Sequence, residues 1–147
     1  MKILLALFAP LGLLLLAGSP QERAAGGPEF VAVDVFVDAG ARGLAAWQIE
    51  IVADAGMTKV VGVEGGDGPY APNPPYYDPE ALHGSGRVIV AAYTLADRAP
   101  TGRVRVARIH FMEEAPAHYA AKLLAAAEPG GDHIGAAVEV VKLGGKK

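Results

Sequence analysis

The amino-acid sequence predicts an all-β domain, an antiparallel β-sandwich of about seven to nine strands, preceded by a signal peptide. Three observations lead to this prediction. Apolar and polar residues alternate over several short segments, which is the pattern of half-buried strands. Clusters of glycine, proline and aspartate separate these segments, as in antiparallel sandwiches. The 147 residues suffice for one domain, and no segment is unambiguously helical.

The N-terminal segment has the three-part pattern of a secretory signal. Lys2 supplies a positive charge, residues 3–17 form an apolar run, and small residues follow. The run is shorter than the roughly 20 residues of a membrane-spanning helix, and Pro10 and Gly12 interrupt it. We therefore expect residues 1–19 to be a cleaved signal peptide; an uncleaved anchor is the alternative.

The rest of the chain divides by composition. Residues 20–29 are mostly polar or small and predict a flexible leader, residues 30–143 form the sandwich domain, and residues 144–147 form a disordered tail. Export implies a secreted, periplasmic or cell-surface protein. No membrane span is expected after signal cleavage.

The first two strands have clear period-two patterns. In residues 30–38 valines occupy every second position, which places β-branched side chains on one face. In residues 44–53 the inward positions are Trp47, Ile49 and Ile51. Both segments predict half-buried strands.

Two further strands have less polar patterns. Residues 58–64 predict a third strand with Val61 and Val63 directed inward. Residues 87–95 are apolar on both faces, which predicts a central strand.

Residues 102–112 predict a strand with a bulge. The apolar positions change from even to odd numbers along it, and one extra residue near Ala107 would keep them on one face. Arg103, Arg105 and Arg108 alternate with these positions. The net charge is −3, so we interpret the arginines as a solvated surface and expect no nucleic-acid partner.

Residues 118–127 allow two predictions. Alanine, leucine and lysine favour a helix, but apolar and polar residues also alternate. We favour a strand. Residues 129–132 then predict a hairpin turn into another strand over residues 134–141.

Four segments occur in an order that resembles a known family. They are GLAAWQI at residues 43–49, VVGVEGGD at 60–67, GRVIVA at 86–91 and a strand ending in Phe111. The order is similar to that of cohesin-type modules and their carbohydrate-binding-module relatives. The resemblance covers residues 31–141.

The resemblance implies an immunoglobulin-like sandwich without catalytic activity, which binds a partner domain in an extracellular or cell-surface assembly. One departure concerns an acidic Y-D-P element that the family has after the strand of Trp47. Residues 52–55 read VADA at this place.

The inventory of reactive residues contains no catalytic set. The chain has no cysteine, which excludes disulfides and thiolate chemistry. The four histidines do not pair at the spacings of metal ligands. Serine is scarce, and we identify no nucleophile with a base and an orienting residue. We expect a protein that is not an enzyme.

Metal binding has two weak candidates. His83 lies near Asp78 and Glu80, and a solvated surface is the preferred interpretation of these three residues. Four aspartates could contribute to a calcium site, but their spacing matches no calcium loop. They are Asp34, Asp38, Asp67 and Asp78. We expect no cofactor.

The long proline-rich segment of residues 65–86 is the best functional lead. Prolines stiffen it, and tyrosines offer flat apolar faces with a polar tip for a sugar ring or a protein hot spot. The candidate ligand-binding residues are Tyr70, Asn73, Tyr76, Tyr77 and Asp78. The alternative is that the tyrosines cap one end of the sandwich.

Together these patterns predict an exported binding or scaffolding module that recognises a protein partner in an extracellular or cell-envelope assembly. The alternative function is a carbohydrate-binding module that uses the tyrosine-rich loop of residues 68–83 to hold a polysaccharide.

Overall fold

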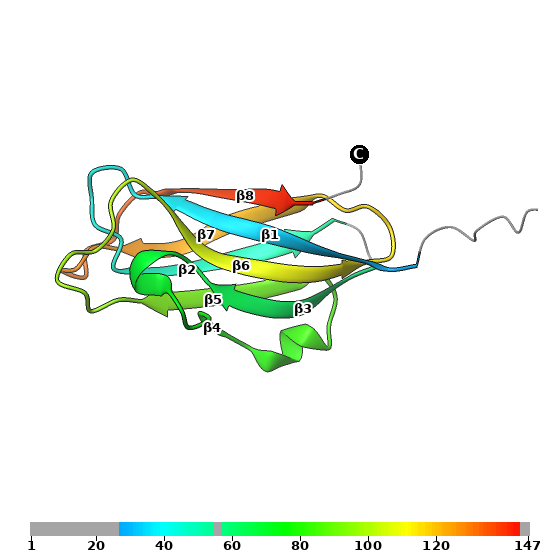
Figure 1. The fold of residues 1–147 in the computed structure, drawn as a ribbon. Coiled ribbons are helices and arrows are strands. Elements are labelled where there is room, and N and C mark those ends of the chain that lie inside the picture. Colours follow the sequence, from blue (N-terminus) through cyan, green and yellow to red (C-terminus); the bar gives the residue numbers. More distant parts are fainter. Residues whose placement is uncertain (1–26, 55–56, 145–147) are drawn as a thin grey trace, which may run out of the picture.

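The computed structural model describes residues 27–54 and 57–144, which form two antiparallel sheets packed face to face (Figure 1). The predicted β-sandwich is confirmed. The strands are β1 (Glu29–Asp38), β2 (Ala46–Ala53), β3 (Thr58–Gly65), β4 (Tyr76–Tyr77), β5 (Arg87–Tyr93), β6 (Arg103–Glu113), β7 (Tyr119–Ala127) and β8 (Ala137–Leu143). Two short 3-10 helices, η1 (Gly68–Tyr70) and η2 (Pro79–Leu82), flank β4. The predicted signal peptide and most of the leader lie outside the described residues.

Each sheet has four strands. Sheet A has the order β3-β6-β1-β8, and sheet B has the order β4-β5-β2-β7. Strands that are neighbours in a sheet are antiparallel and mostly far apart in sequence. Within the described part of the chain, no helix is long and apolar enough to cross a membrane.

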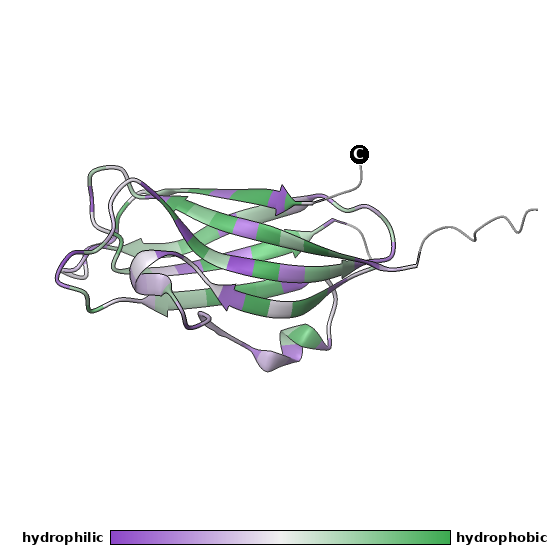
Figure 2. Cartoon of the chain, in the orientation of Figure 1, coloured by the Kyte–Doolittle hydropathy of each residue, from purple (hydrophilic) through white to green (hydrophobic). Residues whose placement is uncertain are grey.

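The core lies between the inner faces of the two sheets. Hydrophilic and hydrophobic residues alternate along β1, β3 and β6, so each strand has one apolar side (Figure 2). The four predicted valines of β1 and the predicted Trp47, Ile49 and Ile51 of β2 are buried. Facing side chains from β5 and β6 include Val88, Val90, Ile109 and Phe111. Full burial stabilises the fold by about 1.5–3 kcal/mol for each large apolar side chain.

The bulge predicted in β6 is confirmed. Val35 of β1 pairs with Ala107, whereas the next residue, Phe36, pairs with Arg105. Val106 is therefore the extra residue of β6, and both Val106 and Ala107 are buried. The bulge lets the inward side of β6 change from even to odd numbers without exposing apolar side chains.

The prediction for Val61 is wrong. The side chain of Val61 is 42% exposed, and Val60 is the residue that is fully buried. The reason is a second bulge, because the pairing of β3 with β6 skips from Val60 to Gly62. After the bulge, Val63 packs partly against the core as predicted.

Residues 119–127 form a strand, as favoured, but the predicted hairpin with the next strand is wrong. β7 pairs with β2 in sheet B, and β8 pairs with β1 in sheet A. The chain does turn after β7, where a single bridge joins Ala127 to His133. Ile134 is then buried in the core, and the chain crosses to the other sheet before β8 begins.

Candidate ligand-binding surface

The segment between β3 and β5 is held close to sheet A by two glycines. A side chain at Gly66 would place its first carbon 2.2 Å from the carbonyl oxygen of Arg105 on β6. At Gly65 that carbon would lie 2.5 Å from the carbonyl oxygen of Asn73. Because glycine has no side chain at either position, the segment can pack closely against β6 and return to form β4 at the edge of sheet B.

Tyr70 is largely a core residue. Its side chain is 5% exposed, and its hydroxyl donates a hydrogen bond of 2.6 Å to the carbonyl oxygen of Leu44. Its ring packs edge-on against Trp47, with ring centroids 5.8 Å apart. Burial raises the pKa of Tyr70 to about 12. Its role matches the alternative expectation, in which a tyrosine caps one end of the sandwich.

Tyr77 and Asp78 also have structural roles. Tyr77 pairs with Val90 on β5 and packs partly against the core. The carboxylate of Asp78 accepts a hydrogen bond of 3.0 Å from the backbone N–H of Glu80 at the start of η2. This cap satisfies a backbone donor that the short helix leaves free.

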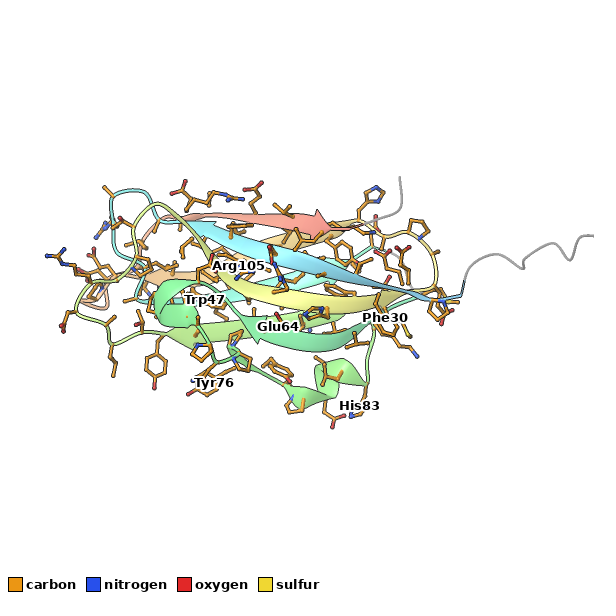
Figure 3. All side chains as sticks on the ribbon, viewed as in Figure 1. Phe30, Trp47, Glu64, Tyr76, His83 and Arg105 are labelled. Atoms are coloured by element: carbon orange, nitrogen blue, oxygen red, sulfur yellow. The ribbon has the colours of Figure 1, made fainter. Side chains whose placement is uncertain are left out.

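Tyr76 points to the outside of sheet B. It pairs with Ala91 of β5, and its side chain is 70% exposed (Figure 3). Its ring is stacked with that of Tyr93, with centroids 6.4 Å apart and ring planes 7° from parallel. Tyr93 is 59% exposed and belongs to the strand that we predicted to be central. Its period-two position already placed it on the same face as Ile89 and Ala91, but the sequence did not indicate the pairing with Tyr76.

An open cleft of about 390 Å³ lies beside these two tyrosines. It is lined by Pro69, Tyr70, Ala71, Asn73, Pro74, Pro75, Tyr76, Ala92, Tyr93 and Val106. Three of the five predicted site residues, Tyr70, Asn73 and Tyr76, are thus brought together. Tyr77 and Asp78 are not part of this lining.

The outer face of sheet B has few charged side chains. The strand register directs a set of alanines to this face, namely Ala46, Ala91, Ala120, Ala125 and Ala127. Exposed Val52 and Leu124 add apolar surface. Arg87 forms an ion pair of 2.6 Å with Glu50, and Lys122 lies opposite Glu50 on β7.

The outer face of sheet A is charged, and its charges pair with one another. The carboxylate of Asp34 accepts hydrogen bonds of 2.7 and 3.0 Å from Arg108, and Arg105 lies 3.4 Å from it. Arg105 also binds Asp67 at 2.6 Å. Burial would raise the pKa of Asp34, but the bonds and charges of the two arginines outweigh burial and lower it.

Arg103 continues this surface. Its guanidinium lies 3.5 Å from the ring centroid of Phe36 and forms an ion pair with Glu139 at 3.0 Å. The predicted solvated arginine face is therefore a network of partnered cations.

The aspartates considered for calcium are used in other ways. Asp34 and Asp67 are joined by Arg105, and Asp38 accepts a hydrogen bond from the backbone N–H of Gly40. In residues 27–54 and 57–144, no three acidic or histidine side chains cluster closely enough to hold a metal ion. His83 is exposed beyond η2 (Figure 3).

Glu113 is a buried carboxylate at the end of β6. It accepts a hydrogen bond of 2.6 Å from the hydroxyl of Tyr119 on β7, and bonds of 2.7 and 2.9 Å from Lys142 on β8. Burial opposes its ionisation, but these partners outweigh burial and lower its pKa. The cluster therefore ties sheet A to sheet B at the end of the sandwich.

No family model, no curated protein and no solved structure matches the chain. The all-β, two-sheet antiparallel architecture is established by the strand pairing itself.

Proposed function

We propose that the protein is an exported, non-catalytic binding module of the cohesin type, and that a folded protein partner docks on the outer face of sheet B. The observation that carries this proposal is the contrast between the two outer faces. Sheet B presents alanines, exposed valine and leucine, and two exposed tyrosines. Sheet A presents charges that already have partners, and its exposed apolar side chains, Phe30 and Val61, lie apart from the Asp34 cluster on β1 and β3.

A face of small side chains suits a rigid partner. Alanine side chains lose almost no conformational freedom when a partner covers them, so burial of this face has a low entropic cost. Tyrosine is enriched among binding hot spots, and Tyr93 and Tyr76 lie at the β4 side of the face.

The charges on this face indicate the chemistry of the partner. Arg87 and Lys122 lie on either side of the single carboxylate of Glu50, which leaves an excess of positive charge. We therefore expect the partner to offer an apolar surface bordered by acidic side chains, which would steer association and fix its register.

Docking on sheet A would be less favourable. A partner would have to remove water from the arginines around Asp34, and pairs that already exist inside the protein would add little new attraction. We therefore propose docking on sheet B only.

The test uses two matched substitutions on edge strands. Ala125→Arg places a large cation on the outer face of β7 in sheet B, and Ala137→Arg places the same side chain on the outer face of β8 in sheet A. The protein is immobilised and exposed to exported proteins of its source, and each captured protein is purified and titrated by calorimetry.

We expect saturable binding that weakens by about tenfold or more in Ala125→Arg, which corresponds to about 1.4 kcal/mol, and is unchanged in Ala137→Arg. Equal loss in both variants, or loss in Ala137→Arg alone, would place the contact elsewhere and contradict the proposal.

A further inference from the structure

The cleft beside Tyr76 lies at the edge of the sandwich, because its lining includes Ala92 of sheet B and the buried Val106 of sheet A. It opens where β4 meets β5, between the returning loop and the sheet edge. Tyr76 and Tyr93 are large, adjacent and mostly exposed, even though each could have been directed into the core by a shift of one residue. Exposed aromatic groups beside a cleft commonly mark a ligand site.

The chemistry of the lining restricts the ligand. None of the side chains around the cleft carries a charge at neutral pH. An anionic or cationic ligand would lose its water without gaining an opposite charge, which is costly. Asn73, whose side chain is exposed, offers both an amide donor and a carbonyl acceptor. The cleft therefore suits a neutral ligand with hydroxyl groups.

The cleft is largely preformed. Pro69, Pro74 and Pro75 restrict its backbone, and Pro75 is buried. Gly65 lies so close to the carbonyl oxygen of Asn73 that a side chain there would overlap it, so the loop packs tightly against the end of β3. A preformed site loses less conformational entropy on binding, which matters for a ligand with few strong contacts.

We propose that this cleft is a binding site for a neutral saccharide. One face of a sugar ring stacks on the Tyr76–Tyr93 pair, where its C–H groups contact the aromatic surface. The side chain of Asn73 and the tyrosine hydroxyls bind hydroxyl groups at the ring edge. Tyr93, which the sequence did not single out, contributes half of the aromatic surface.

A proline-rich peptide is the competing ligand, because such peptides also dock on aromatic grooves. Two observations favour the saccharide. The rings of Tyr76 and Tyr93 are nearly parallel, with planes 7° apart and centroids 6.4 Å apart, an arrangement that suits the flat faces of sugar rings. The position of Asn73 on the cleft wall supplies a side-chain amide for hydroxyl groups.

The experiment is affinity electrophoresis of the purified protein through gels that contain hydroxyethyl cellulose, xylan, mannan or amylose, with polygalacturonate as an anionic comparison. We expect at least one neutral polysaccharide to retard the protein and polygalacturonate not to do so. Tyr76→Ala should weaken retardation on the order of tenfold, and Asn73→Ala and Tyr93→Ala should weaken it by several-fold.

The controls separate stacking from folding and from the docking face. Tyr76→Phe keeps the ring but removes its hydroxyl, so it should weaken binding less than Tyr76→Ala does. Phe30→Ala removes an aromatic side chain that is 72% exposed on the other sheet and should retain binding. Ala125→Arg should also retain it, so failure of protein docking and failure of saccharide binding can be distinguished. Melting curves identify any variant that is unfolded.

Three results would overturn the proposal. One is the absence of retardation in all four neutral gels. Another is retardation that survives Tyr76→Ala in a folded protein. The third is binding of a proline-rich decapeptide, measured by fluorescence anisotropy, that is lost in Tyr76→Ala while no polysaccharide is bound.

Discussion

The outer faces of sheet A and sheet B both belong to four-stranded antiparallel sheets, but they differ in how their polar side chains are satisfied. On sheet A, a carboxylate on an inner strand is covered by two arginines from the next strand. On sheet B, the corresponding inner strand exposes Gln48 between two alanines. The difference teaches that one face satisfies its polar groups internally, whereas the other leaves its surface free for a ligand or partner.

The paired charges explain how Asp34 can be buried on an outer face. Its side chain is 9% exposed because Arg105 and Arg108 extend across it. A carboxylate in that position is stable when charged only while its partners remain, since an unpaired buried charge is costly. The outer face of sheet B has no carboxylate as deeply buried as Asp34, so we expect substitutions there to have less effect on folding.

The largest expected effect concerns the loop that joins the two regions. Gly66→Ala should lower the free energy of unfolding by about 3 kcal/mol, because its new methyl group would overlap the backbone of β6 at Arg105. The cleft should be lost as well, because its wall depends on this contact. Urea unfolding measures the first effect, and affinity electrophoresis measures the second.

The matched control is Gly130→Ala. Its new methyl group would meet nothing within 4 Å, and we expect a change within about 0.5 kcal/mol. A similar loss in both variants would show that the close packing at Gly66 is not the cause.

The second prediction compares the two faces directly. Asp34→Ala should lower the free energy of unfolding by about 2 kcal/mol, because it leaves Arg108 partly buried without its carboxylate and leaves Arg105 with Asp67 alone. The expected loss is smaller than the roughly 3–5 kcal/mol for breaking a fully buried ion pair, because both arginines are partly solvated. Gln48→Ala on sheet B should change stability by less than about 0.5 kcal/mol. Chemical denaturation measures both variants. If Asp34→Ala and Gln48→Ala lower the free energy of unfolding equally, the two faces do not differ in the way we describe.

The third prediction concerns acid. The pKa values of Asp34 and Glu113 lie below their ordinary values of 3.8 and 4.5, because charged and hydrogen-bonding partners outweigh burial. The unfolded chain therefore binds protons at a higher pH than the folded chain does. The stability that these groups contribute is present above pH 4.5 and is lost as the pH falls through their folded pKa values.

The measurement is the melting temperature between pH 7 and pH 3. The decrease should correspond to a loss on the order of 1 kcal/mol from these two groups. The double variant Asp34→Asn/Glu113→Gln should be less stable at pH 7, and its melting temperature should decrease less steeply as the pH falls. A decrease as steep as that of the unmodified protein would assign acid sensitivity to other carboxylates.

The sequence predicted the elements whose local pattern has one interpretation. In β1, valine at every second position defines a single apolar side. The bulge in β6 was also predictable, because the change of phase at Ala107 would otherwise expose apolar residues. In β3, by contrast, Val60, Val61 and Val63 allow either phase, and the pattern cannot place a bulge.

The candidate site was predictable in part. The density of proline and tyrosine marked residues 65–86 as a ligand-binding candidate, and Asn73 and Tyr76 do line the cleft. The pattern could not separate Tyr70, which enters the core, from Tyr76, which leaves it. It also could not find Tyr93, because the stacking depends on the pairing of β4 with β5.

The sequence by itself therefore determined which segments become strands, where the chain turns, and that a stiff loop rich in tyrosine interrupts them. These properties depend on alternation, backbone restriction and turn residues, which act over a few positions. The tertiary structure alone decided that β8 crosses to sheet A, that Asp34 meets Arg105 and Arg108, and that Tyr76 meets Tyr93. Each of these contacts joins residues that are distant in sequence, and the register between strands sets them because it maximises burial of the whole core.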